Sequence, residues 1–564
     1  MEETVAEYII QFLLSKGITT IPGIPGGTIL PIYDALAKSK LRHILARHEQ
    51  GAGFIAQGMA RSTGKVAACL VSSGPGVANL LTAVSDAYSD SVPLLIFSGQ
   101  VPTNLIGTNA FQELPTKSIV SHFTKANYCI TDPSLVPYIL EEAYQLAKEG
   151  RPGPVWIDLP KDIQNASLDI SFFQDLKYKP IELKIDAIPL HETEIMFNAF
   201  LNHFDKYLLE ANKPLFYIGG GAKKYADQMY DFINQMNIPV VSTLMGLGIF
   251  SSHDPLFLGM MGMHGSIEAN LALGECDLLI ALGVRFDDRA TGNIDTFCPQ
   301  AKIVHIDIDR KEIGKNKIPD LSWLGDIGFF LKNTKLSIEN FAKKEPWTNK
   351  NRLNENYFSR KTNAKLPIEK FLLSLGELFK KGDFILTDVG QHQMWTAQFF
   401  PFPSAKCWIT SGGQGTMGFG LPTAIGVAIE NTEANVYCIT GDGSIMMNIQ
   451  ELATLRELNA NVKIIILNNK HLGLVRQQQE LFYGDRKSGS LFEFQPNFIA
   501  LAESFGIPAI SCTLGESEEK LISAINEIGP RLIEISIPEG DGVFPFVPGG
   551  KSNQEFLLRE EVLN

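Results

Sequence analysis

The sequence lacks long hydrophobic runs, blocks of like charge, tandem repeats and low-complexity tracts. Its apolar runs, such as residues 92–97 and 462–467, are far shorter than the roughly 20 residues that cross a bilayer. The 49 basic and 62 acidic residues are spread along the chain, which argues against binding to nucleic acid or to a membrane surface. The first residues are acidic and helix-periodic, unlike a signal or transit peptide. We therefore expect a cytoplasmic protein without a membrane span.

Clustered cysteines and histidines are missing as well. The seven cysteines are scattered, mostly in apolar segments, and form no Cys-x-x-Cys pair. The ten histidines form no His-x-x-x-His pair. These absences indicate buried thiols in a reducing compartment and argue against a zinc site built from Cys and His. Any metal should therefore be bound by oxygen atoms.

The chain of 564 residues is too long for one hydrophobic core. Short β-branched runs alternate with helix-periodic stretches, which is typical of α/β proteins with parallel sheets. We expect three doubly wound parallel-sheet domains, over residues 1–165, 190–332 and 366–540. A linker rich in Lys, Asn and Glu is predicted over 333–365, and a C-terminal tail over 541–564.

The most informative stretch predicts a strand–helix–strand unit. The motif Gly441–Ser444 follows a predicted strand over 436–440, and Asn469 follows another over 462–467, with a predicted helix over 445–458 between them. Ligands of open α/β sheets bind at the carboxyl ends of the strands. The glycines let backbone approach phosphate oxygens, and the aspartate and asparagine offer oxygen ligands suited to Mg²⁺.

Taken alone, Gly-Asp-Gly is a tight turn and Asn-Asn a loop. Together, at the ends of strands that flank one helix, they resemble the thiamine diphosphate and Mg²⁺ motif of the thiamine-dependent decarboxylases and carboligases. The resemblance implies that the Mg²⁺ is bound by Asp442, Asn469 and the backbone carbonyl of His471.

A thiamine-dependent enzyme also needs a carboxylate beside the aminopyrimidine ring of its cofactor. Glu49 lies between a short predicted strand and a helix rich in small residues. By itself it is better explained as a helix-start glutamate that interacts with the helix dipole. In the thiamine enzymes, however, the catalytic glutamate precedes a Ser-Gly-Pro-Gly segment, which here is Ser73–Gly76, followed by Asn79. Glu49 is therefore the candidate catalytic acid.

Further motifs lie in family order across almost the whole chain: Gly26-Gly27 and residues 47–50, 107–113, 390–395 and 415–422. They resemble the catalytic subunit of acetohydroxyacid synthase, also called acetolactate synthase. The methionine of the last motif is by itself an ordinary core residue, and the resemblance makes it the wedge that bends the cofactor. The residues implied to line thiamine diphosphate are Pro75, Asn79, Gly390, Gln391, His392, Gly415, Met417, Gly441, Gly443, Ser444, Leu472, Gly473, Leu474 and Val475.

The middle unit carries glycine clusters after predicted strands, which are generic phosphate or turn signals. It also carries Arg285-Phe-Asp-Asp-Arg289, which a solvated ion-pair cluster would explain equally well. This run resembles the FAD-dependent biosynthetic synthases, so we expect FAD, in a structural role. The FAD contacts that the resemblance implies are Arg151, Gly219, Gly220, Gly221, Thr243, Leu244, Met245, Gly262, Met263, His264, Gly265, Gly283, Arg285, Asp287, Arg289, Asp307, Ile308 and Asp326.

The implied reaction decarboxylates pyruvate and condenses the remaining two-carbon unit with a second 2-oxo acid, either pyruvate or 2-oxobutyrate. It is the first common step of branched-chain amino acid biosynthesis. Arg289 is the family match for the acceptor carboxylate and an apt bidentate partner for it. The other positions implied near the substrate are Gly27, Phe111, Gln112, Lys161 and Gln478.

Four positions depart from the common family pattern. Gln478 stands where most members have a Trp that contacts the extra methyl of 2-oxobutyrate. Losing one methyl-sized contact is worth about 1–3 kcal/mol, so we expect a weaker preference for 2-oxobutyrate. Ile24, where many members have Tyr, and Gln478 together resemble the isozyme I type of enteric bacteria. For Asn109 in place of Asp, and Gln414 in place of Leu, the sequence offers no explanation.

Two other classes of function stay open at this point. A pyruvate oxidase-type oxidoreductase would also use thiamine diphosphate, Mg²⁺ and FAD, although the Arg285–Arg289 run argues against it. A non-catalytic paralogue would have lost Glu49 or Asp442, and both are present. The resemblance further implies a homodimer or dimer of dimers with active sites at the subunit interface, and a small regulatory subunit.

Overall fold

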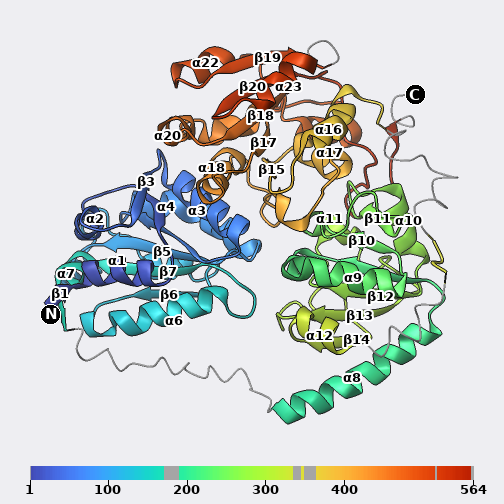
Figure 1. Ribbon diagram of the computed structural model, residues 1–564, viewed down its shortest axis with the longest axis horizontal. Helices are drawn as coiled ribbons and strands as arrows, with labels where there is room; N and C mark the ends of the chain where they lie inside the picture. Colours follow the sequence, from blue (N-terminus) through green and yellow to red (C-terminus); the bar gives the residue numbers. More distant parts are fainter. Residues whose placement is uncertain (1, 170–189, 335–344, 349–363, 515–517, 560–564) are drawn as a thin grey trace.

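The computed structural model describes residues 2–169, 190–334, 345–348, 364–514 and 518–559. It contains three six-stranded sheets and one two-stranded antiparallel pair. Figure 1 shows three lobes, with the C-terminal lobe (orange to red) above the N-terminal lobe (blue) and the central lobe (green to yellow). The predicted α/β fold with three parallel-sheet domains is confirmed. Most of the predicted linker 333–365 and the last residues of the predicted tail lie outside the described ranges.

The N-terminal lobe is built on a parallel sheet of order β3-β2-β4-β5-β7-β6. Its central strands are buried along their whole length, as their continuous apolar runs require. Strands β1 and β8 pair beside it, so this lobe reaches Asp169. Its strands are β1 (Glu2–Thr4), β2 (Thr20–Gly23), β3 (Arg42–Leu45), β4 (Ala67–Val71), β5 (Leu94–Gln100), β6 (Ala126–Cys129), β7 (Val155–Pro160) and β8 (Ser167–Asp169), and its helices are α1 (Val5–Ser15), α2 (Leu30–Ala37), α3 (Glu49–Thr63), α4 (Pro75–Ser89), α5 (Thr116–Val120), α6 (Val136–Lys148) and α7 (Lys161–Asn165).

The central lobe has a parallel sheet of order β11-β10-β9-β12-β13-β14. An aromatic cluster around Phe204 and Phe330 fills the space between this sheet and α8, α9 and α12. The strands are β9 (Pro214–Ile218), β10 (Val240–Ser242), β11 (Phe257–Met260), β12 (Leu278–Leu282), β13 (Lys302–Asp307) and β14 (Leu321–Leu324), and the helices are α8 (Leu190–Glu210), α9 (Ala226–Met236), α10 (Ile267–Glu275), α11 (Asp288–Thr291) and α12 (Ile327–Asn333).

The C-terminal lobe has a parallel sheet of order β16-β15-β17-β18-β20-β19. The strands are β15 (Phe384–Thr387), β16 (Trp408–Ile409), β17 (Val436–Gly441), β18 (Val462–Asn468), β19 (Ala509–Thr513) and β20 (Arg531–Ser536), and the helices are α16 (Pro367–Leu378), α17 (Gln391–Phe399), α18 (Gly420–Glu430), α19 (Asp442–Ile445), α20 (Glu451–Leu458), α21 (Gly473–Phe482), α22 (Phe498–Ser504) and α23 (Glu518–Asn526).

One predicted element is wrong. The stretch 445–458, expected to be one helix, is divided into the end of α19, a 3₁₀ turn over Met446–Asn448, and α20. The turn brings the side chain of Asn448 to the carbonyl of Gly418, 2.7 Å away. The helix-periodic pattern did not reveal this break, because the bond is made to a distant part of the chain.

The N-terminal and C-terminal lobes meet through α3 and α18, which lie side by side in Figure 1. A Cβ at Gly58 would overlap the carbonyl of Thr423, and one at Gly426 would overlap the carbonyl of Ile55. The small residues of α3 therefore let the two helix backbones come close, as the sequence predicts. One apolar core continues across this contact, and six of the seven free cysteines are buried in the described residues.

A buried ionic cluster lies at the same junction. The Arg61 guanidinium donates to Asp86 and Asp90, each at 3.0 Å, and both carboxylates are inaccessible to solvent. Asp86 also accepts the hydroxyl of Thr416 at 2.9 Å, and Asp90 accepts the backbone N–H of Gly412 at 2.9 Å. The cluster therefore fastens the C-terminal lobe to α3 and α4.

Arg61→Ala is expected to destabilise the protein by about 3–5 kcal/mol, because it leaves two buried carboxylates without their cation. Thermal unfolding of the full chain measures the loss. Lys38→Ala is the matched control, since the Lys38–Asp34 pair is exposed and solvent screening leaves it little effect on stability. Equal melting temperatures for both variants would contradict the role given to the cluster.

Candidate active site

The C-terminal sheet changes its winding direction between β15 and β17. Strand β17 lies between β15 and β18, with Thr387 opposite Ile439 and Gly441 opposite Leu467. The loops that follow these three strands therefore leave the sheet at one edge, where open α/β sheets bind their ligands. The motifs beginning at Gly390, Gly441 and Asn468 all lie there.

The predicted metal ligands are among the residues at this edge. Asp442 begins α19 and is 3% exposed; burial raises the pKa of its carboxyl to about 6. Asn469 is also buried, and its side chain donates to Gln391 at 2.9 Å. The oxygen of the Asn469 amide accepts the N–H of His471 at 3.1 Å, which joins two of the three predicted positions directly.

This donor set fits a hard divalent cation. A cation beside Asp442 would stabilise the ionised carboxylate that burial disfavours. Within the described ranges no cluster of three or more His, Cys, Asp and Glu could hold a metal ion. The predicted set of one carboxylate, one amide oxygen and one backbone carbonyl consists of oxygen ligands of the kind that Mg²⁺ prefers.

The loops around these residues are closely packed and contain a buried polar atom without a partner in the described residues. His392 is buried, burial lowers its pKa to about 3, and its Nε2 has no partner in the described residues. Ser444 donates to the carbonyl of Val389 at 2.9 Å, which joins the β15 and β17 loops. A Cβ at Gly473 would overlap the side chain of Gln391, and one at Gly443 would lie 2.8 Å from Leu472.

The loop that carries Gly415 and Met417 is fixed at both ends. The Asp86–Asp90 cluster holds its start, and Asp388 accepts the N–H groups of Gly418 (2.8 Å) and Gly420 (3.0 Å). Burial raises the pKa of Asp388 to about 6. Sequence reasoning missed Asp388; its position directly after the apolar strand β15 was the only available signal.

The remaining predicted cofactor residues lie at the start of α21. Leu472 precedes the helix, Gly473 and Leu474 lie in its first turn, and Val475 is 47% exposed. Gln478 is exposed on the same helix, whereas its neighbour Gln477 is buried and bonded to Val543. These positions border the Asp442 edge from one side.

A second group forms at the carboxyl edge of the N-terminal sheet. Glu49 is the first residue of α3, and its Oε2 accepts the side-chain N–H of Asn79 at 2.9 Å. Its Oε1 lies near the Ser73–Gly76 turn, 3.6 Å from where a Cβ of Gly76 would be. The turn is closed on its other side by Gln112, whose φ is +60°. The structure thus brings Glu49, Pro75, Asn79 and Gln112 together.

The other substrate positions of this lobe surround the same edge. Gly27 follows β2 and has open space where a side chain would be. Phe111 is 86% exposed, and Lys161 begins α7 directly after β7. Among the described residues, no hydrogen bond or ion pair joins Glu49 to Asp442 or Asn469.

All predicted FAD positions of the central lobe lie at or after the carboxyl ends of its strands. The loop after β9 packs on the loop after β12, since a Cβ at Gly219 would overlap the carbonyl of Gly283. The loops after β11 and β12 are joined by the N–H of Met263, which donates to the carbonyl of Arg289 at 2.8 Å. One sheet edge thus collects Gly219, Gly220, Gly221, Thr243, Leu244, Met245, Gly262, Met263, His264, Gly265, Gly283, Arg285, Asp287, Arg289, Asp307, Ile308 and Asp326.

Two arginines join this edge to the N-terminal lobe. Arg151 pairs with Glu312 at 2.9 Å and Asp309 at 3.3 Å, and Arg285 donates to the carbonyl of Ser89 at 2.7 Å. Polar groups without partners also lie here. His264 is buried, its Nδ1 has no partner in the described residues, and burial lowers its pKa to about 4.

The acidic residues at the carboxyl edge of the central sheet differ in burial and in hydrogen bonding. Burial raises the pKa of Asp307 to about 6, while Asp287 and Asp326 cap α11 and α12. The Arg289 side chain is 69% exposed, and among the described residues its guanidinium makes a 3.7 Å pair with Asp288 and a 3.7 Å contact with the sulfur of Met263. A polar cofactor fits an edge with buried, unpartnered donors and acceptors.

Comparison with known proteins matches all three lobes. Residues 3–119, 201–334 and 388–535 match the thiamine pyrophosphate enzyme N-terminal TPP binding domain, central domain and C-terminal TPP binding domain. The large subunit of acetolactate synthase isozyme 1 from Escherichia coli (strain K12) is 44% identical over 98% of this chain and 97% of its own. The chain belongs to the acetolactate synthase family.

Relatives from other organisms are also named acetolactate synthases. The chloroplastic acetolactate synthase of Arabidopsis thaliana is 41% identical over 97% of this chain and 83% of its own. The acetolactate synthase large subunit of Cyanidium caldarium is 40% identical over 98% of this chain and 97% of its own. The predicted resemblance to acetolactate synthases, isozyme I included, is confirmed, and so is a thiamine diphosphate-dependent fold.

The structure shows the surroundings of three of the four positions that depart from the common acetolactate synthase pattern. Asn109 has a φ of +59°, a left-handed conformation that Asn and Asp tolerate well. Gln414 donates to the hydroxyl of Ser89 at 3.0 Å, a bond that Leu could not make. Ile24 packs against the core shared by the N-terminal and C-terminal lobes.

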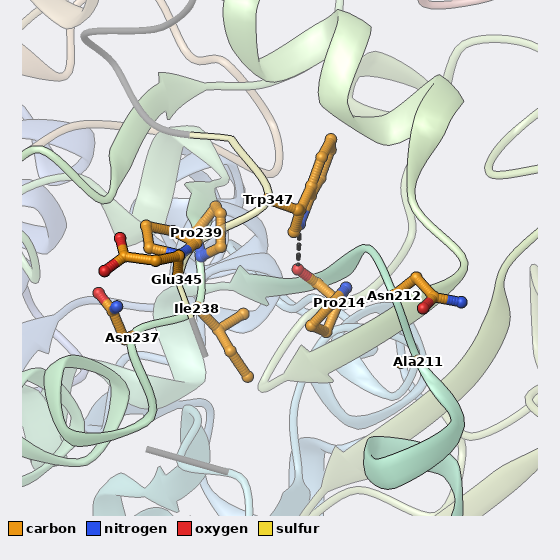
Figure 2. A pocket seen from close by; sticks show the side chains of 9 residues that line it. Ala211, Asn212, Pro214, Asn237, Ile238, Pro239, Glu345 and Trp347 are labelled. Carbon is orange, nitrogen blue, oxygen red and sulfur yellow. Dashed lines mark hydrogen bonds between the residues drawn. The ribbon is translucent and has the colours of Figure 1, made fainter. Parts of the chain in front are cut away.

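A separate hollow of about 160 Å³ lies on the central lobe. Figure 2 shows Pro214 and Ile238 on its wall, and the Trp347 indole donating to the carbonyl of Pro214 at 2.7 Å. Pro214 begins β9, and Ile238 precedes β10. The hollow is therefore at the amino ends of these strands, away from the edge with the predicted FAD positions.

Proposed function

We propose that this protein is the catalytic subunit of an acetolactate synthase, which decarboxylates pyruvate and transfers the two-carbon unit to pyruvate or 2-oxobutyrate. The observation that carries the proposal is the edge where β15, β17 and β18 end, with buried Asp442 and Asn469 and with His392, whose Nε2 has no partner in the described residues. The near full-length agreement with proteins named acetolactate synthase supports the same reaction.

Thiamine diphosphate, when bound, supplies the electron sink for cleavage of the carbon–carbon bond. Asp442, Asn469 and the carbonyl of His471 would hold the Mg²⁺ ion. The glycines and Ser444 would line the diphosphate, and Met417 would support the ring system. Because Asn79 donates to Oε2 of Glu49, Oε1 would be the oxygen that holds or releases a proton.

Arg289 receives the carboxylate of the acceptor. Its guanidinium is exposed and has only long contacts, to Asp288 and Met263. A planar guanidinium binds a carboxylate through two parallel hydrogen bonds. Phe111, Gln112, Lys161 and Gln478 complete the substrate surroundings.

The residues at the carboxyl edge of the central sheet would hold FAD, in a structural role, because the net reaction transfers no electrons to it. The glycine loops after β9 and β12 approach each other closely, and His264 offers an unpartnered ring nitrogen. Arg151 and Arg285 supply positive charge beside this edge.

The active site is completed by a second copy of the chain. Glu49 and Asp442 belong to different lobes, and no hydrogen bond or ion pair joins them in the described residues; the Glu49 group would serve the Asp442 group of a partner in a homodimer or a dimer of dimers. Two of the relatives are named large subunits, which supports a small regulatory subunit as a further partner.

Gln478→Trp is expected to raise the share of 2-aceto-2-hydroxybutyrate formed from mixed pyruvate and 2-oxobutyrate by about tenfold. An added apolar contact to one methyl group is worth about 1–3 kcal/mol. Competition assays with quantified products measure this ratio. Gln479→Trp, one residue further along α21, is the control, and an unchanged ratio for Gln478→Trp would remove the specificity role.

An assay of the purified full chain tests the proposed function. Pyruvate alone should give acetolactate, and added 2-oxobutyrate should give the mixed product, each lost when thiamine diphosphate or Mg²⁺ is omitted. Oxygen uptake with pyruvate in place of acetolactate would instead indicate a pyruvate oxidase-type enzyme. No turnover in either assay would contradict the proposal.

A further inference from the structure

A buried carboxylate links the helix after the metal motif to the segment before Glu49. Glu451 begins α20 and is inaccessible to solvent. Its Oε1 accepts the backbone N–H groups of Arg47 at 3.0 Å and His48 at 3.1 Å. Its Oε2 accepts the hydroxyl of Thr454 at 2.7 Å. One side chain of the C-terminal lobe therefore holds two successive peptide groups of the N-terminal lobe.

These peptide groups have few alternative partners. His48 is the N-cap of α3, and the N–H groups at and before a helix start have no partner inside the helix. A carboxylate at this end also interacts favourably with the helix dipole and forms charge-assisted hydrogen bonds. A buried acceptor at this position is therefore stabilising only while it stays aligned with both N–H groups.

The neighbouring sequence is adapted to this contact. A Cβ at Gly51 would overlap Oε1 of Glu451, so the glycine two residues after Glu49 leaves room for the carboxylate. Thr454 also reaches the carbonyl of Leu45 at 3.3 Å. Helix α20 thus contacts the chain on both sides of the β3–α3 turn.

We infer that Glu451 is a positioning residue for Glu49. The inference rests on the proposed function, in which Glu49 shares a proton with the cofactor. Asn79 holds the side chain of Glu49, and Glu451 holds the backbone that precedes it. A displacement of about 1 Å at a catalytic group can cost on the order of 10²-fold in rate. Glu451 therefore couples the Asp442 helix region to the placement of the catalytic acid.

Three variants separate this role from a general loss of packing. Glu451→Ala removes the acceptor. Glu451→Gln keeps an oxygen at the Oε1 position, and its amide can donate to Thr454, whose hydroxyl then donates to Leu45. Glu457→Gln is the matched control, because it lies on the same helix but contacts only the exposed guanidinium of Arg47.

Hydrogen–deuterium exchange of the full chain without cofactor gives the first readout. The amides of Arg47 and His48 should exchange at least tenfold faster in Glu451→Ala, since they lose their shared acceptor. Exchange in Glu451→Gln and Glu457→Gln should match the wild type. This measurement does not depend on catalysis.

The second readout is the exchange rate of the C2 proton of bound thiamine diphosphate, which NMR measures. Calorimetry measures the affinity for the cofactor in the same variants. Glu451→Ala should slow this exchange by on the order of 10²-fold with little change in cofactor affinity. The conservative Glu451→Gln should restore most of the rate. A merely structural residue would lower affinity and stability without this selective effect.

Wild-type exchange at Arg47 and His48, or a wild-type C2 exchange rate in a folded Glu451→Ala, overturns the inference. If the alanine variant does not fold, Glu451→Asp decides by the same two readouts, because its carboxylate is one methylene shorter. The wild type and Glu49→Gln are measured in the same experiments. Normal C2 exchange in Glu49→Gln, or no acetolactate from the wild type, would instead contradict the proposed function.

Discussion

Glu49→Gln lowers acetolactate formation from pyruvate by about 10²–10⁴-fold, the range typical of a lost general acid–base group. Glutamine has the same shape and can still accept the hydrogen bond from Asn79, so the surroundings of α3 stay intact. It cannot hold or release a proton at the Oε1 position. A steady-state assay of acetolactate, with thiamine diphosphate and Mg²⁺ saturating, measures the loss.

The control is Glu503→Gln, which removes an exposed carboxylate of α22 and should leave turnover unchanged. Glu49→Gln should also keep the melting temperature and the thiamine diphosphate affinity of the wild type. Undiminished turnover in a variant that binds the cofactor normally would show that Glu49 takes no part in the chemistry.

Asp442→Ala is expected to weaken Mg²⁺-dependent binding of thiamine diphosphate by roughly 10²-fold. Asp442 is the only carboxylate of the predicted metal site, and losing a charged ligand or hydrogen-bond partner costs about 1.5–3 kcal/mol or more. Isothermal titration with Mg²⁺ present and absent measures the change. Equal affinity with and without the carboxylate would refute the metal assignment.

Stability without cofactor distinguishes lost binding from misfolding. Burial raises the pKa of Asp442 from 3.8 to about 6, so its ionisation disfavours the folded state and stability falls as pH rises between these values. At pH 7 to 8, Asp442→Asn should therefore have a free energy of unfolding up to about 3 kcal/mol above that of the wild type, and should unfold at a higher temperature. The difference should vanish near pH 4, and the opposite sign would contradict the burial argument.

Much of the fold follows from local sequence patterns. The strands over 436–441 and 462–468 are apolar runs of a length suited to a buried parallel sheet, and the structure places both in one. The loops after them had to leave at a single edge, since parallel strands share their direction. That is why the Asp442 and Asn469 positions could be predicted as neighbours.

Other features depend on contacts between lobes. The Arg61–Asp86–Asp90 cluster binds Thr416, which is far from all three residues in the sequence. No local pattern connects Thr416 with the cluster. Glu451 looks like a polar residue on an amphipathic helix until its bonds to Arg47 and His48 are seen. The break after α19 has the same origin, because Asn448 bonds to Gly418.

The sequence by itself determined the α/β class, the three sheets, the oxygen-rich metal motif and the resemblance to acetolactate synthases, since periodicity, glycine spacing and motif order are local properties of the chain. Tertiary structure alone decided how the lobes are fastened together and which buried carboxylates hold the Met417 loop and the Glu49 turn. Those contacts depend on side chains hundreds of residues apart, and only packing brings them within hydrogen-bonding distance.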